Sequence, residues 1–322
     1  MNVTKRKFLH GSIALLGSLG WVLPTHAQQK LTRLVVGFPP GGGGDNFARL
    51  IAEQLRRELG TVVVDNRPGA AGQLAVESFL RGPTDGSVMM MHTASTAVFV
   101  PAVRKIPPYD PIKDFQWVGL MSSAPFVLVA NPKLPVADLK SFLDYLRANP
   151  GQPYGSAGIG GSTHLAAELL FEKAGVKALH VPYSGAAPSL LATLSGEVTC
   201  KLETLQNVQH LQAAGTLKIL AVLGDARERI APELPTAKEF GIDIAASTYN
   251  LLALPTQTPV QRTAEVARAL RNAMKNTEFQ KKLLSIGVQP ITDTSPEKTR
   301  AFVAAEMARW TRVARNLKLD TA

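Results

Sequence analysis

A run of four glycines, Gly41 to Gly44, separates a short apolar segment from an amphipathic one. The apolar residues 34–36 predict a buried strand, which Pro39 and Pro40 end. In residues 47–59 the apolar side chains recur every three or four positions, which predicts a helix whose first turn Asp45 caps. The segment therefore predicts a βα unit in which a bare backbone loop leads into a helix.

This loop favours a small anion as its ligand. Glycines have no Cβ, so several N–H groups can turn toward one point in front of a helix N-terminus. A phosphate-binding loop needs Gly-Lys-Ser/Thr where this chain has Gly44, Asp45 and Asn46, and the dinucleotide fingerprint lacks its third glycine. We therefore expect a carboxylate rather than a polyphosphate. A tight turn that binds nothing is the alternative.

The first 27 residues have the order of a secretion signal. A basic start at residues 5–7 precedes an apolar core at 13–23 and a small-x-small site that ends at Ala27. We expect cleavage after Ala27 and export of the mature chain. Residues 4–9 resemble a twin-arginine signal with Lys-Arg in place of Arg-Arg, so both export routes remain open. Cleavage removes three positive charges from a chain of formal charge +10, and the remaining +7 fits an anionic small ligand.

The opening pattern returns twice further along the chain. Residues 154–164 form a second glycine loop before a helix, and residues 181–189 form a third strand, loop and helix. The strand at 87–92 ends in the hydroxyl side chains of 93–96, which lie at the edge where α/β sheets bind ligands or, alternatively, only cap a helix. Two sets of such loops predict an α/β protein of two lobes that face one another across a cleft.

No catalytic set is evident in the sequence. Ser156 lacks the first glycine of a Gly-x-Ser-x-Gly elbow, and no histidines show metal-ligand spacing. His164 and Glu168 stand one helical turn apart, which a helix start explains without a metal. Cys200 is the only cysteine, so no internal disulfide forms. We expect no enzyme activity, no metal and no cofactor. Aromatic residues are few and no basic run is present, so we do not expect nucleic acid as a partner.

Six ordered motifs together resemble the tripartite tricarboxylate transporter receptor family, the Bug-type periplasmic solute-binding proteins. They begin at Phe38 (FPPGGGGD), Val62 (VVVDNRPGAAG), Pro108 (PYDPIKDF), Tyr154 (YGSAGIGGSTHLAAEL), His180 (HVPYSGAAP) and Leu234 (LPTAKEFG). The resemblance implies a periplasmic-binding-protein fold of the Venus-flytrap type II class, with a βα sheet sandwich in each lobe. An apolar strand at 126–130 and a β-branched passage at 242–254 are the expected crossings between lobes, which places residues 28–127 and 251–322 in lobe 1 and residues 128–250 in lobe 2.

The resemblance also implies a function and a site. We expect a monomeric receptor that closes on a small carboxylate solute and delivers it, by transient contact, to an inner-membrane permease. A sensor that feeds a signalling protein and an exported serine hydrolase are the alternatives. The expected ligand-binding residues are Phe38, Pro39, Pro40, Gly41, Gly42, Gly43, Thr93, Ser95, Ser156, Gly158, Ser162, Thr163, Tyr183 and Glu203.

The chain departs from the family where specificity would be set. An Asp-Asn pair is usual after one strand of lobe 2, and this chain has Glu203 and Thr204, with Lys201 two residues earlier. If Glu203 faces the cleft, it favours a ligand with an amine or hydroxyl opposite its carboxylate. If it pairs with Lys201 at the surface instead, it has no role in ligand choice.

Overall fold

The computed structural model of the chain describes residues 31–319, apart from residues 229 and 287. The predicted signal, residues 1–27, lies outside the described residues, so its cleavage stays a prediction. Within the described part of the chain, no helix is both long and apolar enough to cross a bilayer.

The described residues build one nine-stranded sheet with the order β2-β1-β3-β9-β4-β7-β5-β6, in which β8 also pairs with β4. The strands are β1 (Thr32–Val36), β2 (Val62–Asn66), β3 (Val88–Thr93), β4 (Phe115–Ala130), β5 (Pro153–Ser156), β6 (Leu179–Pro182), β7 (Cys200–Thr204), β8 (Lys218–Val222) and β9 (Ser247–Pro255). Strand β1 pairs in parallel with β2 and β3, and β5 pairs in parallel with β6 and β7.

The helices cover this sheet and connect its strands. They are α1 (Gly43–Leu59), α2 (Gln73–Leu80), α3 (Val100–Ala102), α4 (Leu139–Ala148), α5 (Ser162–Lys173), α6 (Ala186–Ser195), α7 (Leu205–Ala213), α8 (Val260–Lys275), α9 (Thr277–Ser285) and α10 (Pro296–Asn316). Short turns of helix, η1 (Ala70–Gly72), η2 (Ser95–Phe99) and η3 (Ala237–Phe240), complete the set.

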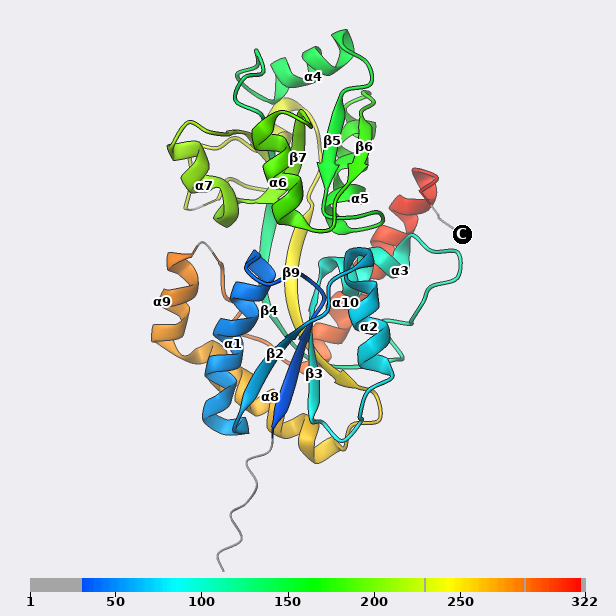
Figure 1. Cartoon of the computed structure of the whole chain (residues 1–322), viewed down its shortest axis with the longest axis vertical. Coiled ribbons are helices and arrows are strands. Elements are labelled where there is room, and N and C mark those ends of the chain that lie inside the picture. The colour runs from blue at the N-terminus through cyan, green and yellow to red at the C-terminus, as the bar shows by residue number, and fades with distance from the viewer. Residues whose placement is uncertain (1–30, 229, 287, 320–322) are drawn as a thin grey trace, which may run out of the picture.

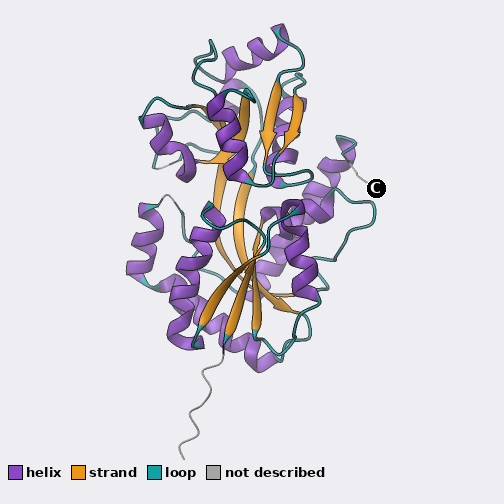
Figure 2. Ribbon diagram, in the orientation of Figure 1, coloured by secondary structure: helices purple, strands orange, loops and turns teal. Residues whose placement is uncertain are grey.

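The elements gather into two lobes joined by two long strands (Figure 1). Lobe 1 holds β1 to β3 with α1, α2 and α8 to α10, and lobe 2 holds β5 to β8 with α4 to α7. Figure 2 shows β4 and β9 running from one lobe into the other. Because lobe 1 takes its elements from both ends of the chain, the connection between lobes is made by this antiparallel pair.

Strand β4 is longer than the sequence pattern suggested. Its first part, from Phe115 to Pro125, pairs with β9, and its last part, from Phe126 to Ala130, pairs with β7 and β8. Only residues 126–130 had the apolar run of a buried strand, because Gln116 and the Ser122-Ser123 pair interrupt the earlier part. The predicted lobe boundaries, 127/128 and 250/251, fall inside β4 and β9 and remain predictions.

The core of lobe 1 has a layer on each face of the sheet. Leu34 packs in one layer with Ile51 of α1, while the adjacent Val35 packs in the other with Phe79 of α2. Successive side chains of a strand point to opposite faces, so a parallel strand covered by helices on both sides is apolar throughout. This layering holds the carboxyl ends of β1 and β3 toward lobe 2, where the two glycine loops meet.

Candidate functional site

The first glycine loop is held open by Asp45 and Asn66. Helix α1 begins at Gly43 with Gly42 as its N-cap, so the prediction that Asp45 caps the helix is wrong. The Asp45 carboxylate instead accepts a hydrogen bond from Gly41 N at 2.9 Å, and Asn66 Nδ2 donates to its other oxygen at 2.9 Å. With the loop fixed in this way, the first-turn N–H groups of α1 lie at the lobe boundary without partners of their own helix.

The charge of Asp45 is compensated inside lobe 1. Burial raises the pKa of this carboxyl, but hydrogen bonds from Arg49, Gly41 and Asn66 outweigh burial and hold the pKa below its usual range. Arg49 Nε lies 2.9 Å from Asp45 Oδ2. Asp45 is therefore an ionised support for the loop with both oxygens occupied.

The second glycine loop lies at the start of α5 in lobe 2. Gly158 and Gly160 adopt φ of 139° and 73°, which only glycine takes readily. Thr163 Oγ1 accepts a hydrogen bond from Ala157 N at 3.0 Å, and His164 Nδ1 accepts one from Gly160 N at 3.1 Å. The loop is thus tied to the first turn of its own helix, as the first loop is through Asp45.

The two lobes touch through these loops. Ser162 N donates to Ser95 Oγ at 3.1 Å, and the two serine hydroxyls are 3.1 Å apart. A Cβ on Gly158 would lie 3.4 Å from Ala71, and one on Gly185 would lie 3.6 Å from Pro39. The glycines therefore allow close approach of one lobe to the other, which is the arrangement of a closed cleft.

A hollow of about 520 Å³ remains between the lobes beside these contacts. Residues of the segments 37–38, 69–72 and 100–104 line it from lobe 1, and residues 157–159 and 182–184 line it from lobe 2. Three predicted site residues, Phe38, Gly158 and Tyr183, are in this lining. Its volume suits a small organic molecule.

The other predicted site residues lie around the hollow in different roles. Pro39 and Gly43 touch lobe 2, Ser95 and Ser162 bond to each other, and Pro40, Gly41 and Gly42 complete the first loop. Thr93 Oγ1 is buried and has no hydrogen-bond partner within the described residues. Such a group at the cleft is a candidate donor to a ligand, since buried polar atoms are normally paired.

The hydroxyl of Ser156 is buried against a histidine of the neighbouring strand. Its Oγ is buried and lies 2.6 Å from His180 Nε2, a contact that the sequence pattern did not reveal. The His180 ring stacks with those of Tyr154 and His164, and burial lowers the pKa of His180 to about 4. At neutral pH this ring is uncharged and is a weaker base than an ordinary histidine. The contact instead fixes the strand end from which the second loop departs.

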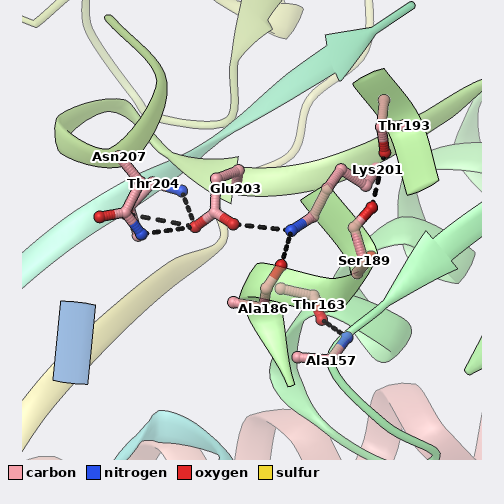
Figure 3. A network of polar contacts seen from close by, with 9 residues as sticks. All are labelled: Ala157, Thr163, Ala186, Ser189, Thr193, Lys201, Glu203, Thr204 and Asn207. Atoms are coloured by element: carbon pink, nitrogen blue, oxygen red, sulfur yellow. Dashed lines mark hydrogen bonds and ion pairs between the residues drawn. The ribbon is translucent and has the colours of Figure 1, made fainter. Parts of the chain in front are cut away.

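Glu203 and Lys201 form a buried ion pair beside the cleft (Figure 3). Lys201 Nζ lies 2.7 Å from Glu203 Oε2 and donates to Ala186 O at 3.0 Å. Glu203 Oε1 accepts from Thr204 N at 2.8 Å and from Asn207 Nδ2 at 3.0 Å. Lys201 is 1% exposed and Glu203 is 4% exposed, so the surface pair considered from the sequence is in fact internal.

Three features of the cleft escaped the sequence analysis. Ala70 and Ala71 adopt positive φ, 48° and 54°, and this strained turn faces the second loop. Arg104 lines the hollow, and Asn207 reaches lobe 1, where a Cβ on Gly43 would lie 3.0 Å from its Oδ1. Of these three features, only the Pro-Gly-Ala-Ala-Gly segment at 68–72 could have been predicted from the sequence, because its composition indicates a tight turn.

Gly43 offers a direct test of lobe contact. We expect Gly43→Ala to weaken binding of any cleft ligand by about tenfold, since its Cβ would press on Asn207 and cost about 1.4 kcal/mol in the closed form. Folding stability should stay equal or rise by about 0.5–1 kcal/mol, because alanine favours the helix over glycine. Gly44→Ala is the matched control, as its Cβ would meet nothing closer than 3.9 Å. Calorimetric titration measures the affinity of each variant, and thermal melts measure its folding stability. Equal affinities of the two variants would show that the contact of Gly43 with Asn207 plays no part in ligand binding.

Two lobes joined by two strands, with glycine loops at helix starts meeting across a hollow, define a periplasmic binding protein of the cleft type. Residues 47–319 match the description "Tripartite tricarboxylate transporter family receptor", and the chain belongs to that family. The family consists of periplasmic solute receptors and not of enzymes, so the hydrolase alternative is set aside.

Solved structures agree over nearly the whole fold. The periplasmic binding protein BugD is 28% identical and superposes with a TM-score of 0.85, covering 90% of this chain and 98% of that chain. Rpa4515 of R. palustris, solved with adipate, is 30% identical with a TM-score of 0.85 over 89% and 97% of the two chains. MatC of Rhodopseudomonas palustris, solved with bound malate, is 27% identical with a TM-score of 0.84 over 88% and 98%. The predicted family and two-lobed α/β fold are therefore confirmed.

Proposed function

We propose that this protein captures a small carboxylate-bearing solute in the periplasm by lobe closure and delivers it to a permease of the tripartite tricarboxylate type. The observation that carries the proposal is the meeting of two glycine loops, each at a helix N-terminus, on the two sides of one hollow. Backbone N–H groups at helix starts favour anions, and groups from both lobes can hold a ligand only when the lobes are together.

The charge around the cleft supports an anionic solute. Within segments 37–45, 69–72, 93–104, 156–163, 182–187 and 203–207, the acidic and basic side chains are those of Asp45, Arg104 and Glu203. Arg49 pairs with Asp45 and Lys201 pairs with Glu203, so both carboxylates of these segments are neutralised by neighbouring cations, and Arg104 brings a guanidinium to the lining of the hollow. Two relatives solved with adipate and with malate make a dicarboxylate the first class of solute to examine.

Delivery to a permease is proposed from membership of the transporter receptor family. A receptor that is predicted to lose its signal after Ala27 and to act as a monomer would meet an inner-membrane partner transiently, in the closed form. Of the predicted site residues, Phe38, Gly158 and Tyr183 line the hollow and are proposed to contact the solute, and the other residues of the two glycine loops are proposed to form the cleft walls around them.

A thermal-shift panel tests this proposal. We expect one class of mono-, di- or tricarboxylate, at about 100 times its Kd, to stabilise the mature protein by about 2.7 kcal/mol, which raises its melting temperature by about 5 °C. Sugars and cationic amines of similar size should leave the melting temperature unchanged. Protein unfolded and refolded to remove any co-purified solute is the material to use. A panel in which no acid raises the melting temperature of such protein contradicts a carboxylate receptor.

A further inference from the structure

One large apolar residue of the second glycine loop is open to the hollow. Ile159 belongs to the lining and is 56% exposed. Its neighbours on both sides touch lobe 1, since a Cβ on Gly158 would lie 3.4 Å from Ala71 and one on Gly160 would lie 2.8 Å from Val103. Ile159 therefore stands between two points of contact with lobe 1, with more than half of its surface uncovered.

The side chains that line the hollow with Ile159 are mainly apolar. Lobe 1 contributes Phe38, Val100 and Val103, together with the glycines and alanines of the turn at 69–72, and lobe 2 contributes Pro182. These side chains can pack against a hydrocarbon, but they neither donate nor accept a hydrogen bond. A ligand body held against them gains most when it is apolar itself.

Polar side chains are few in this lining. Within the described residues they are Arg104, Tyr183 and Ser184. The guanidinium of Arg104 donates hydrogen bonds but cannot accept one, so it suits a ligand carboxylate. The hydroxyl of Tyr183 donates to Glu197 Oε1 at 2.7 Å. The described part of the lining includes no aspartate or glutamate to accept the proton of a ligand hydroxyl.

Closure of the lobes makes the character of this wall important. Ser162 of lobe 2 bonds to Ser95 of lobe 1 beside the hollow, so a ligand held there loses much of its water. A hydroxyl that leaves water without gaining a new hydrogen-bond partner is disfavoured. An apolar pocket discriminates against one added hydroxyl by up to about 100-fold.

We propose that Ile159 determines the substrate class of this receptor: together with the apolar wall of lobe 1, it selects carboxylic acids with a hydrocarbon body over the same acids carrying a hydroxyl on that body. The inference rests on the proposed carboxylate receptor function, in which backbone groups of the two loops hold the carboxylate. Ile159 was not among the site residues expected from the sequence, and Glu203, which was expected to favour an amine or hydroxyl, does not line the hollow.

Matched ligand pairs test the selectivity. Calorimetry on refolded, solute-free protein compares butyrate with 3-hydroxybutyrate, glutarate with 3-hydroxyglutarate, and tricarballylate with citrate. The members of each pair differ by one hydroxyl on the body of the acid. For whichever acid binds, we expect its hydroxylated counterpart to bind about 10- to 100-fold more weakly.

Two results of this comparison would overturn the proposal. One is equal or tighter binding of the hydroxylated member of any pair that binds, which would leave the carboxylate receptor function intact. The other is the absence of binding by both members of every pair. In that case the thermal-shift panel shows separately whether the protein is a carboxylate receptor at all.

Substitutions at Ile159 assign the selectivity to this side chain. Ile159→Thr places a hydroxyl on the wall, so the ratio of affinities within a pair should fall below about threefold. Ile159→Val keeps the wall apolar, and its ratio should stay within about threefold of that of the wild type. Ile106→Thr is the matched control, because Ile106 is 86% exposed and is not part of the lining, and it should leave both affinities unchanged.

Thermal melts without ligand separate selectivity from folding. The Ile159 and Ile106 variants should melt close to the wild type, because both side chains are more than half exposed. If Ile159→Thr does not fold, the matched pairs on wild type still decide the selectivity. A wild-type ratio in folded Ile159→Thr, or an equal change of ratio in Ile106→Thr, overturns the assignment to Ile159.

Discussion

The free energy of unfolding is expected to fall as the pH is lowered from 7 to 5, and replacing His92 by phenylalanine should make this fall smaller by about 2 kcal/mol. His92 is fully buried on β3, with Phe115 and Trp117 packed edge-on against its ring at centroid distances of 4.7 and 5.0 Å. Neither ring nitrogen has a hydrogen-bond partner of good geometry within the described residues. Burial lowers the pKa of His92 to about 3, against a smaller opposing effect of the Thr96 backbone.

The direction of the effect follows from proton uptake by the unfolded chain. A histidine with a pKa near 6.5 when unfolded and about 3 when folded binds more protons unfolded at every pH between these values. Its contribution to stability is therefore complete above pH 6.5 and is lost progressively as the pH falls, by about 2 kcal/mol at pH 5.

Two other histidines act in the same direction. Burial lowers the pKa of His164 to about 3, with a further contribution from His180, and lowers the pKa of His180 to about 4. With about 2 kcal/mol from each of the three histidines, the free energy of unfolding of the wild type should fall by about 6 kcal/mol from pH 7 to pH 5, and that of His92→Phe by about 4 kcal/mol. Urea unfolding at the two pH values measures both losses. His210→Asn, which changes an exposed histidine on α7, is the control, and equal losses in His92→Phe and wild type would contradict the assignment.

Truncating Trp310 to alanine is expected to cost about 3–5 kcal/mol of folding stability, as other large aromatic truncations in cores do. Trp310 lies on α10, is fully buried, and packs on Phe99 with ring centroids 4.4 Å apart. Its Nε1 donates to Glu306 Oε2 at 3.1 Å, and the guanidinium of Arg309 lies 4.9 Å from the ring centroid. Trp310 is thus one of the buried side chains, with Thr299, Val303 and Ala314, through which α10 packs on the rest of lobe 1.

The same helix provides the comparison for that experiment. Arg312→Ala removes an exposed side chain from α10 and should change stability by less than about 0.5 kcal/mol. Trp310→Phe keeps an aromatic ring and should recover much of the loss. Denaturant melts of the three variants measure these differences. A loss below about 1 kcal/mol for Trp310→Ala would mean that α10 is not an integral part of the core.

Much of the fold was predictable because its signals are local. The strand, glycine loop and helix at 34–59 follow from a short apolar run, four residues without Cβ and a period of three to four. The second loop, at 154–164, carries the same signals and leads into α5 as predicted. Each of these features depends on backbone preferences and burial within a dozen or so neighbouring residues.

Strand β4, which runs from one lobe into the other, could not be predicted in full from local sequence patterns. Residues 115–125 of β4 carry polar side chains and a glycine, and they are a strand because β9, more than a hundred residues later, supplies their hydrogen bonds. Contacts at this separation depend on the whole chain and leave little periodicity in the sequence. Likewise, the contact of Ser156 with His180 exists because β5 and β6 are paired.

The sequence by itself determined the family, the two-lobed architecture and the loops that suit an anion, because these reside in ordered motifs and local backbone chemistry. Only the tertiary structure decided how the ionisable groups of the cleft are used. Glu203 and Lys201 are two residues apart in the sequence, and nothing there distinguishes an exposed pair from a buried one. Burial against Ala186 and Asn207 removes both from water and ties each to the other, since a charge without water requires a partner. The sequence left open whether Glu203 faces the cleft or pairs with Lys201 at the surface, and the structure pairs the two residues in the interior, with both Glu203 oxygens bonded within lobe 2.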